Sequence, residues 1–531
     1  MPVMDRLLKV GSMADSVGLY VPAMVFQKAL HFARVLVFWH LLGGIEYGLW
    51  GVSSMVFTLA SSVVTLGAYQ GLVRYVSYYE ARGDLPRLFR AAGIGSLLIG
   101  LATTALAVAG SAPLTRWIVV PSESGADVPF AYHQMVFVAA MVNALAMALY
   151  HTMLSFLIGL RTYRLVSLIE VAYAILFAAG GAAALVYQPT GLAALWAHAA
   201  ALGAMLLAGV PMLRACIARS GPQSAGDDAV ASLALEHVAE SDQAVASPAG
   251  PDRAAPLADA AAPLLRVVRF GLVTLVGTFL WHAATYLSYW MVHRRYGESA
   301  GGAFQGFLRL AQPIVYIANA AWAVIFSHVA RRWEASQRRE AMFSLETSFK
   351  AVVFGTMTLS VLLYATLPAW VWIVPDWARK YGPVAGGLLM LFQTVTNLSL
   401  MTILAKLRER PGMIAWAALA GLGANALLAW WWMPRYGVTG AAWAAGVGML
   451  LGAGAVNFVY LLGTRAGVSA GAYAAMACPL VLLLPPLWSA GAWAVVLALA
   501  AFTPLLFAPR QKQAVRYALR KYLRAIGRLG R

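Results

Sequence analysis

The stretch Phe304-Gln-Gly-Phe-Leu-Arg-Leu-Ala-Gln-Pro-Ile-Val-Tyr-Ile-Ala-Asn-Ala-Ala-Trp322 places a permanently charged side chain inside an apolar run. Its polar residues recur at intervals of four, three, four and three positions, and they are Gln305, Arg309, Gln312, Tyr316 and Asn319. That spacing predicts a single polar face on a helix. Because a charge inside a bilayer is costly, such a face indicates a polar cavity, a substrate path or a deliberate pairing. We therefore expect the protein to move a polar, anionic substance through a membrane.

The composition is that of an integral membrane protein. Of 531 residues, 61% are hydrophobic and only 11% are charged, whereas about a quarter of the residues of a soluble domain carry a charge. Apolar windows of roughly 20 residues predict an all-α polytopic fold of about fourteen spans, of which the first is too long for a removable signal peptide. The expected spans are residues 16–40, 45–69, 90–111, 131–157, 163–187, 191–214, 264–292, 302–329, 347–374, 383–406, 412–433, 438–463, 470–488 and 490–508. Within the last pair, Pro485 and Pro486 interrupt the pattern.

The distribution of basic residues predicts the orientation. An even number of spans puts both termini on one side, and most of the 39 Lys and Arg residues fall on that side. Because cytoplasmic loops retain basic residues, we expect both termini in the cytoplasm of a bacterium and the spans in its inner membrane. The net charge of +18 then reflects topology and contact with anionic lipids rather than nucleic-acid binding.

Two six-helix lobes and three smaller segments describe the expected organisation. Residues 217–262 are rich in Ala, Ser, Pro, Asp and Glu, which is typical of a disordered linker. The tail has Arg516, Arg520, Arg524 and Arg528 at every fourth position, which predicts a basic amphipathic helix at the inner leaflet. The expected segments are a first lobe (1–216), the linker (217–262), a second lobe (263–465), an additional helix pair (466–508) and the cytoplasmic tail (509–531).

A faint internal repeat supports the two-lobe arrangement, since many transporters are built from structural repeats. His40-Leu-Leu-Gly-Gly-Ile-Glu-Tyr-Gly48 follows the first span, and His293-Arg-Arg-Tyr-Gly-Glu-Ser-Ala-Gly301 follows the seventh. Tyr187-Gln-Pro-Thr-Gly191 precedes the sixth span, as Tyr436-Gly-Val-Thr-Gly440 precedes the twelfth. The offset between the members of each pair is about the same.

Polar faces on three spans supply the candidate substrate site. The first span carries one face, the seventh carries a second, and the eighth carries the face that contains Arg309. Together the candidate residues are Gln27, Lys28, His31, Arg34, His282, Tyr286, Tyr289, Gln305, Arg309, Gln312, Tyr316 and Asn319. Arg offers a planar fork that matches phosphate oxygens, and Lys acts as a compact charge. Tyr, Gln, Asn and His supply hydrogen bonds, so a sugar linked through a diphosphate suits the set.

Each candidate also has a structural interpretation. Arg34 lies near the outer third of its span, from where it could snorkel to the interface, and His282 with the tyrosines could simply join packed helices. Glu170 is an acid well inside a span, so it could bind a coupling proton or instead pair with a nearby base. Asn143, Gln393, Asn397 and Asn425 are single polar residues of the kind that hydrogen-bond between helices.

The sequence resembles a known group of membrane transporters. The fourteen spans, Gly44-Ile-Glu-Tyr-Gly48, Leu66-Gly-Ala-Tyr-Gln-Gly-Leu-Val-Arg74 and the Thr190-Gly191 turn are similar to those of the polysaccharide transporter family. This family belongs to the multidrug/oligosaccharidyl-lipid/polysaccharide (MOP) flippase superfamily. The resemblance implies a V-shaped pair of lobes around a central cationic cavity that binds undecaprenyl-diphosphate-linked oligosaccharides. It also implies that Lys28, Arg34 and Arg309 contact the phosphates, although the linker is atypical.

We therefore expect a flippase that carries lipid-linked oligosaccharide units to the outer leaflet for the synthesis of O-antigen, capsule or exopolysaccharide. Other polysaccharide-assembly proteins are possible partners, and we expect no nucleic acid, cofactor or metal. One alternative is a cation-coupled multidrug exporter of the same superfamily, although bases outnumber acids inside the spans. A second alternative is a membrane enzyme, such as a polymerase or ligase. The sequence contains no metal-ligand spacing, phosphate-cradling Gly-Lys motif or nucleophile constellation that would favour an enzyme.

Overall fold

The computed structural model describes most of the chain, and every regular element in the described part is a helix. The described residues are 13–67, 69, 72, 75–76, 79–80, 83–121, 128–160, 162–219, 257–334, 337–370, 382–408, 410, 412–464 and 467–517. Most of the predicted linker and the end of the predicted tail lie outside these residues. Contacts divide the described residues into two compact units, of which the first ends at Phe279 and the second begins at Leu280.

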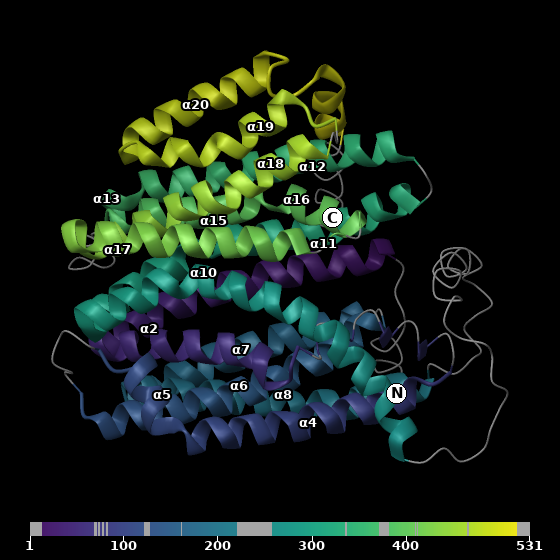
Figure 1. Cartoon of the computed structure of the whole chain (residues 1–531), viewed down its shortest axis with the longest axis vertical. Coiled ribbons are helices and arrows are strands. Elements are labelled where there is room, and N and C mark those ends of the chain that lie inside the picture. Colours follow the sequence, from purple (N-terminus) through teal and green to yellow (C-terminus); the bar gives the residue numbers. More distant parts are fainter. Residues whose placement is uncertain are drawn as a thin grey trace, which may run out of the picture. The chain divides into compact units, whose positions relative to one another are not determined.

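The first unit is a helical bundle built around α2 and α6. In it α2 contacts α6, α7 and α8, and α6 also contacts α4 and α8. Figure 1 shows these helices running side by side within the unit. They are α2 (Met13–Val64), α4 (Leu85–Ala109), α5 (Ser111–Ile118), α6 (Phe130–Gly159), α7 (Tyr163–Tyr187) and α8 (Gly191–Arg219). The helix α10 (Leu257–Ala311) begins in this unit and continues into the second.

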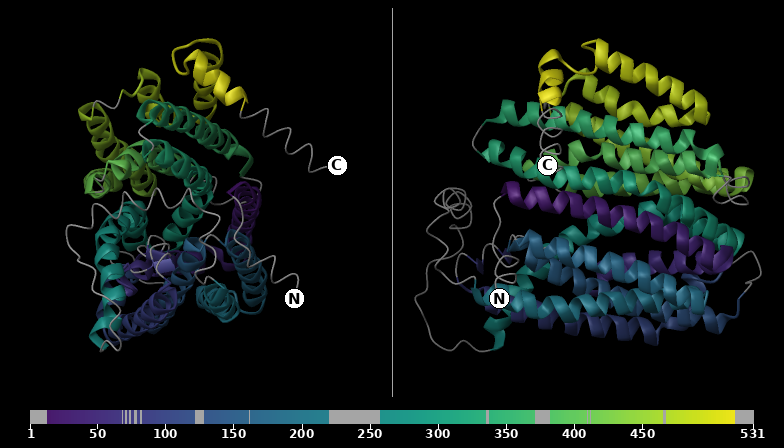
Figure 2. Two further views of the ribbon diagram at one scale, coloured as in Figure 1. Left: turned by 90° about the vertical axis from the view of Figure 1, so that its right-hand side faces the viewer. Right: turned by 180° about the vertical axis from the view of Figure 1, so that it is seen from behind.

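The second unit is organised around α12, α15 and α17, and the C-terminal helices α19 and α20 pack against α12 (Figure 2). Its helices after α10 are α11 (Pro313–Glu334), α12 (Arg338–Ala365), α13 (Leu367–Trp370), α15 (Val384–Asn397), α16 (Ser399–Leu407), α17 (Gly412–Met449), η2 (Leu450–Gly454), α18 (Ala455–Gly463), α19 (Ala470–Ala477), η3 (Cys478–Leu483) and α20 (Pro486–Phe502). A further helical stretch covers residues 509–517.

These helices fit the expected count of about fourteen spans. In the described residues, eight helical stretches are long and apolar enough to cross a membrane. Two of them, Pro22–Val64 and Gly412–Gly463, are long enough for two crossings each, since a span needs about 20 residues. One boundary in the final pair was wrong: the helix starts at Pro486, because proline is favoured in the first turn of a helix and terminates the preceding one.

Single glycines join consecutive spans. Gly43 lies between the first and second spans at φ 68° and ψ −178°, and Gly297 lies between the seventh and eighth at φ 83° and ψ −177°. This region of backbone space is essentially restricted to glycine. The two residues occur in the two sequence stretches that we aligned as a repeat. Both joints therefore have the same backbone conformation. Gly437, at φ 60°, lies between the eleventh and twelfth spans.

Small residues allow close helix packing in the second unit. A Cβ atom added to Gly387 of α15 would collide with the Ala442 backbone of α17, and one added to Gly446 would collide with the carbonyl of Gly387. In a membrane, apolar burial does not drive helices together, so close backbone approach supplies much of their contact energy. The glycines therefore explain why α15 and α17 pack so tightly.

Two of the turns that carry the family resemblance meet in the first unit. The backbone N–H of Gly191 donates to Oε2 of Glu46 at 2.6 Å, and the hydroxyl of Tyr132 donates to the same oxygen at 3.0 Å. Thr190 caps α8, because its Oγ1 accepts from the N–H of Ala193 at 3.2 Å. Glu46 thus fixes the start of α8 against α2.

Candidate substrate-binding site

The Arg309 face is a continuous hydrogen-bonded row in the second unit. The Nη1 atom of Arg309 donates to Oε1 of Gln312 at 3.0 Å, and the Tyr316 hydroxyl donates to the same oxygen at 3.2 Å. With its amide oxygen turned toward the guanidinium, Gln305 accepts from Nε and Nη2 of Arg309 at 2.9 and 3.2 Å. Four of the five side chains that the spacing placed on one face are therefore joined by hydrogen bonds.

A break in the helix crosses this face. We expected one span over 302–329, but α10 ends at Ala311 and α11 begins at Pro313. Pro313 has no N–H to donate to the carbonyl of Arg309 four residues earlier, so one rung of the helical ladder is missing beside the charge. Gln305 is buried, Arg309 is half-buried and Asn319 is exposed, which gives the row a buried end and an accessible end.

The polar face of the seventh span is largely inside the second unit. Tyr289 and His293 are 0% exposed and Tyr286 is 3% exposed, whereas His282 is half-buried. The ring of Tyr289 lies 6.2 Å from that of His293 and 6.3 Å from that of Phe304. The structure therefore places three of these four side chains in helix packing, and only His282 retains partial exposure.

Cationic side chains gather on α2 in the first unit. Gln27, Lys28, His31 and Arg34 are all half-buried. Lys28 interacts electrostatically with Glu170 on α7 and with Arg34, so two basic groups and one acid give this group one net positive charge. The excess positive charge in an apolar helix is the arrangement expected for an anion site.

Arg34 is held by two neighbours. Its Nη2 atom donates to Nδ1 of His31, which assigns the proton of a neutral imidazole to Nε2. Its guanidinium carbon lies 4.0 Å from the centroid of the Phe177 ring on α7, within the range of a cation–π contact worth about 1 kcal/mol. The side chain therefore has a defined direction rather than a free choice of rotamers.

A buried histidine that no sequence pattern indicated packs against Phe177. His198 of α8 is 3% exposed, its ring lies 4.6 Å from that of Phe177, and its Nδ1 is 2.7 Å from Oδ1 of Asn143. The hydroxyl of Tyr173 is 2.7 Å from its Nε2. His198 stands between alanines in the sequence, so only the fold reveals partners that come from α6 and α7.

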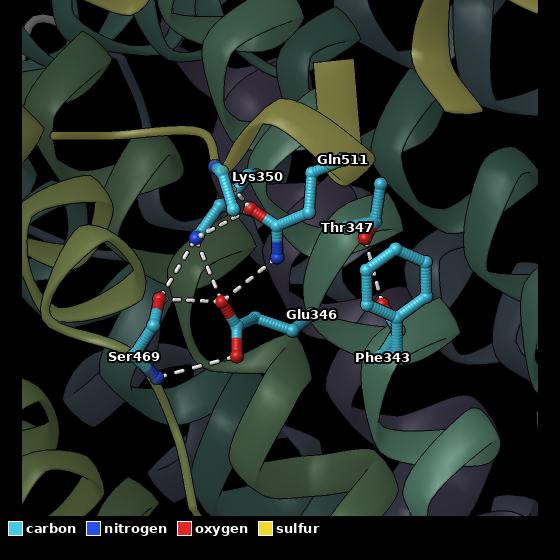
Figure 3. A network of polar contacts seen from close by, with 7 residues as sticks. Phe343, Glu346, Thr347, Lys350, Ser469 and Gln511 are labelled. Atoms are coloured by element: carbon cyan, nitrogen blue, oxygen red, sulfur yellow. Dashed lines mark hydrogen bonds and ion pairs between the residues drawn. The ribbon is translucent and has the colours of Figure 1, made fainter. Parts of the chain in front are cut away.

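An ion pair in the second unit was likewise not foreseen from the sequence (Figure 3). Lys350 and Glu346 of α12 pair at 2.7 Å with side chains that are 2% and 9% exposed. Glu346 accepts from the N–H of Ser469 at 3.2 Å and from Nε2 of Gln511 at 3.1 Å. Lys350 donates to Oγ of Ser469 at 2.8 Å and to Oε1 of Gln511 at 3.1 Å. This pair fastens the start of α19 and the helical stretch 509–517 to α12.

The four single amides join helices as predicted. Asn425 donates to the carbonyl of Ala284 at 3.1 Å and accepts from the hydroxyl of Ser288 at 2.7 Å. Gln393 of α15 donates to the hydroxyl of Thr356 on α12 at 3.2 Å. Asn143 of α6 donates to the carbonyl of Leu195 on α8 at 3.1 Å.

The fourth amide, Asn397, binds the end of α19. It donates to the carbonyls of Ala475 and Met476 at 3.4 and 3.1 Å. Pro479 cannot donate to the carbonyl of Ala475 four residues before it. That carbonyl accepts from the backbone N–H of Cys478 instead, and Asn397 adds a second donor from α15.

Comparisons with known proteins identify the fold. No family model and no curated protein matches the sequence. Among solved structures, the chain is similar to the lipid II flippase MurJ in an inward closed conformation, with a TM-score of 0.60, 12% identity, and coverage of 90% of this chain and 98% of that one. It is similar to an inward-facing multidrug resistance MATE transporter of the MOP superfamily, with a TM-score of 0.56, 13% identity, and coverage of 83% and 95%.

A third solved structure widens the range of functions on this fold. It is a MOP superfamily transporter from Pyrococcus furiosus for which a reversed polarity of the binding pocket suggests a different function. The TM-score is 0.51 at 14% identity, with coverage of 88% of this chain and 98% of that one. The chain thus has the fold of MOP-superfamily transporters and is a multi-pass membrane protein, and the predicted resemblance is confirmed at that level.

Proposed function

We propose that the protein is a flippase for undecaprenyl-diphosphate-linked oligosaccharides. It would carry these units from the cytoplasmic to the outer leaflet of a bacterial inner membrane, with both termini cytoplasmic, during the synthesis of O-antigen, capsule or exopolysaccharide. The observation that carries the proposal is the excess positive charge of the Lys28, Arg34 and Glu170 group. The Arg309 row is a second cationic group of the same character.

The chemistry of these groups suits a diphosphate. Guanidinium groups bind phosphate oxygens through paired, charge-assisted hydrogen bonds, and a lysine adds a compact charge. Gln27, Gln312 and Tyr316 offer donors and acceptors for sugar hydroxyls. In the proposed mechanism the basic side chains replace water around the diphosphate, the polyprenyl chain stays in lipid, and the two units change their access from one side to the other.

Glu170 is the proposed coupling residue. Because its charge interacts with that of Lys28, protonation of Glu170 would leave the bases with a larger excess of positive charge. Substrate binding and proton binding would then favour one another. The driving force is a proton gradient in this proposal, with the membrane potential acting on the same charges.

Translocation in liposomes tests the proposal. Purified protein would be reconstituted with an undecaprenyl-diphosphate-linked sugar, and the sugar that becomes accessible to an external enzyme would be measured. We expect Lys28→Ala and Arg309→Ala to lower the rate at least tenfold, since a lost hydrogen bond to a charged group costs about 1.5–3 kcal/mol. Arg435→Ala is the matched control, because Arg435 is exposed and bonds only its own helix at Trp431 in the described contacts.

Multidrug export is the alternative function, since one of the similar solved structures is a multidrug resistance transporter. The same liposomes would be loaded with a cationic dye in place of the lipid-linked sugar. Dye efflux without sugar translocation would establish the exporter and exclude the flippase. Full translocation by both Lys28→Ala and Arg309→Ala would remove the two bases from the substrate site.

A further inference from the structure

The ring of Phe177 contacts both a cation and a buried histidine in the first unit. The guanidinium carbon of Arg34 is 4.0 Å from its centroid. The centroid of the His198 imidazole is 4.6 Å away. Phe177 is 1% exposed, so neither neighbour reaches it through solvent.

Other rings leave Phe177 no room to turn. Its centroid lies 5.6 Å from that of Phe38 in an edge-on contact and 5.8 Å from that of Trp50. Phe38 approaches because α7 has Gly181 one turn after Phe177, where a Cβ atom would collide with the Phe38 ring. The face that Phe177 shows to Arg34 is therefore fixed by the packing of α2 against α7.

Hydrogen bonds fix His198 in turn. The amide nitrogen of Asn143 donates to the carbonyls of Ala139 and Leu195 at 2.8 and 3.1 Å, which commits the amide oxygen to face His198. Nδ1 of His198 must then donate to that oxygen, and in the neutral ring Nε2 accepts from the Tyr173 hydroxyl. The imidazole has one tautomer and one orientation.

We propose that Phe177, backed by His198, is a positioning residue that holds the Arg34 guanidinium in one orientation for an anion. This inference rests on the proposed function, which makes Arg34 a phosphate-binding side chain. An arginine that is already ordered loses less conformational entropy when it binds, and that loss is about 0.5–1.5 kcal/mol for a long side chain. We call Phe177 with His198 the platform. It would raise the affinity of Arg34 for the anion without contacting the anion.

Two measurements test the platform on the full-length protein in nanodiscs. The first is the rate at which an arginine-specific dicarbonyl reagent modifies Arg34, followed by peptide mass spectrometry, which requires no substrate. The second is the binding of inorganic pyrophosphate by calorimetry. We expect Phe177→Leu and His198→Gln to speed modification of Arg34 and to weaken pyrophosphate binding by about 3- to 10-fold.

Phe156→Leu is the matched control, because Phe156 is also 1% exposed in the first unit but packs against Phe89. It should leave modification of Arg34 and pyrophosphate binding unchanged. Unchanged modification of Arg34 in both Phe177→Leu and His198→Gln overturns the platform. If modification responds as expected but the wild type fails to bind pyrophosphate, the platform stands and the diphosphate substrate is excluded.

Discussion

The two units both place a lysine beside a glutamate within membrane-crossing helices, but they surround the pair differently. In the second unit Glu346 and Lys350 are almost fully buried and share Ser469 and Gln511 as partners. In the first unit Lys28 and Glu170 are half-buried and Arg34 adds a second positive charge. A neutral pair with its hydrogen bonds complete stabilises a joint between helices, whereas an excess of half-buried positive charge can accept an anion.

The largest expected effect is a loss of stability in the second unit, when the buried ion pair loses one partner. Glu346→Ala or Lys350→Ala leaves a buried charge without its counter-ion, which costs about 3–5 kcal/mol. Thermal unfolding of the purified protein in detergent would measure the loss. The double variant Glu346→Gln with Lys350→Met removes both charges and should recover most of it. A single variant that unfolds like the wild type would show that the pair is not a structural joint.

The next largest effect is expected in the first unit, where substrate binding should be lost without a large loss of stability. Arg34→Gln should weaken substrate binding by roughly 30-fold, because a hydrogen bond to a charged group contributes about 2 kcal/mol. The same variant should lower the free energy of unfolding by only about 1 kcal/mol, the contribution of the cation–π contact between Arg34 and Phe177. Binding and thermal unfolding would be measured on one preparation. Loss of stability without loss of binding would place Arg34 with the structural charges.

A smaller effect is expected at Gly43 and Gly297, where the two units have the same backbone conformation. Gly43→Ala and Gly297→Ala each force a side chain into a glycine-only conformation, and we expect each to cost about 1–3 kcal/mol in thermal unfolding. A Cβ atom at Gly43 would meet open space, and so would one at Gly93 inside α4, where the backbone is ordinary helix. Gly93→Ala is thus the matched control and should be neutral or slightly stabilising. Equal behaviour of Gly43→Ala and Gly93→Ala would rule out backbone strain.

The smallest expected effect concerns coupling in the first unit. Glu170→Gln removes the titratable acid but keeps a similar shape, so translocation without a gradient should persist. Stimulation by a proton gradient should disappear, and it would be measured in liposomes at a fixed internal pH. Retained stimulation would leave Glu170 as a counter-ion of Lys28 and nothing more.

Hydropathy was enough to predict the spans, because each crossing needs a long apolar run, and the helical period was enough to align Gln305, Arg309, Gln312 and Tyr316. The period alone could not show that Pro313 divides that face, because a spacing rule does not register the N–H that proline lacks. Ser469 and Gln511 lie more than a hundred residues from Glu346, so no local sequence pattern predicts that they surround the buried ion pair. His198 was missed for the same reason.

The glycine joints have a consequence for anyone handling the protein. At Gly43, Gly297 and Gly437 the chain passes from one helical segment to the next through a single non-helical residue. A protease, an antibody or an inserted epitope finds almost no loop there. A reporter belongs instead where two helices are further apart in the sequence, as α5 and α6 are: α5 ends at Ile118 and α6 begins at Phe130.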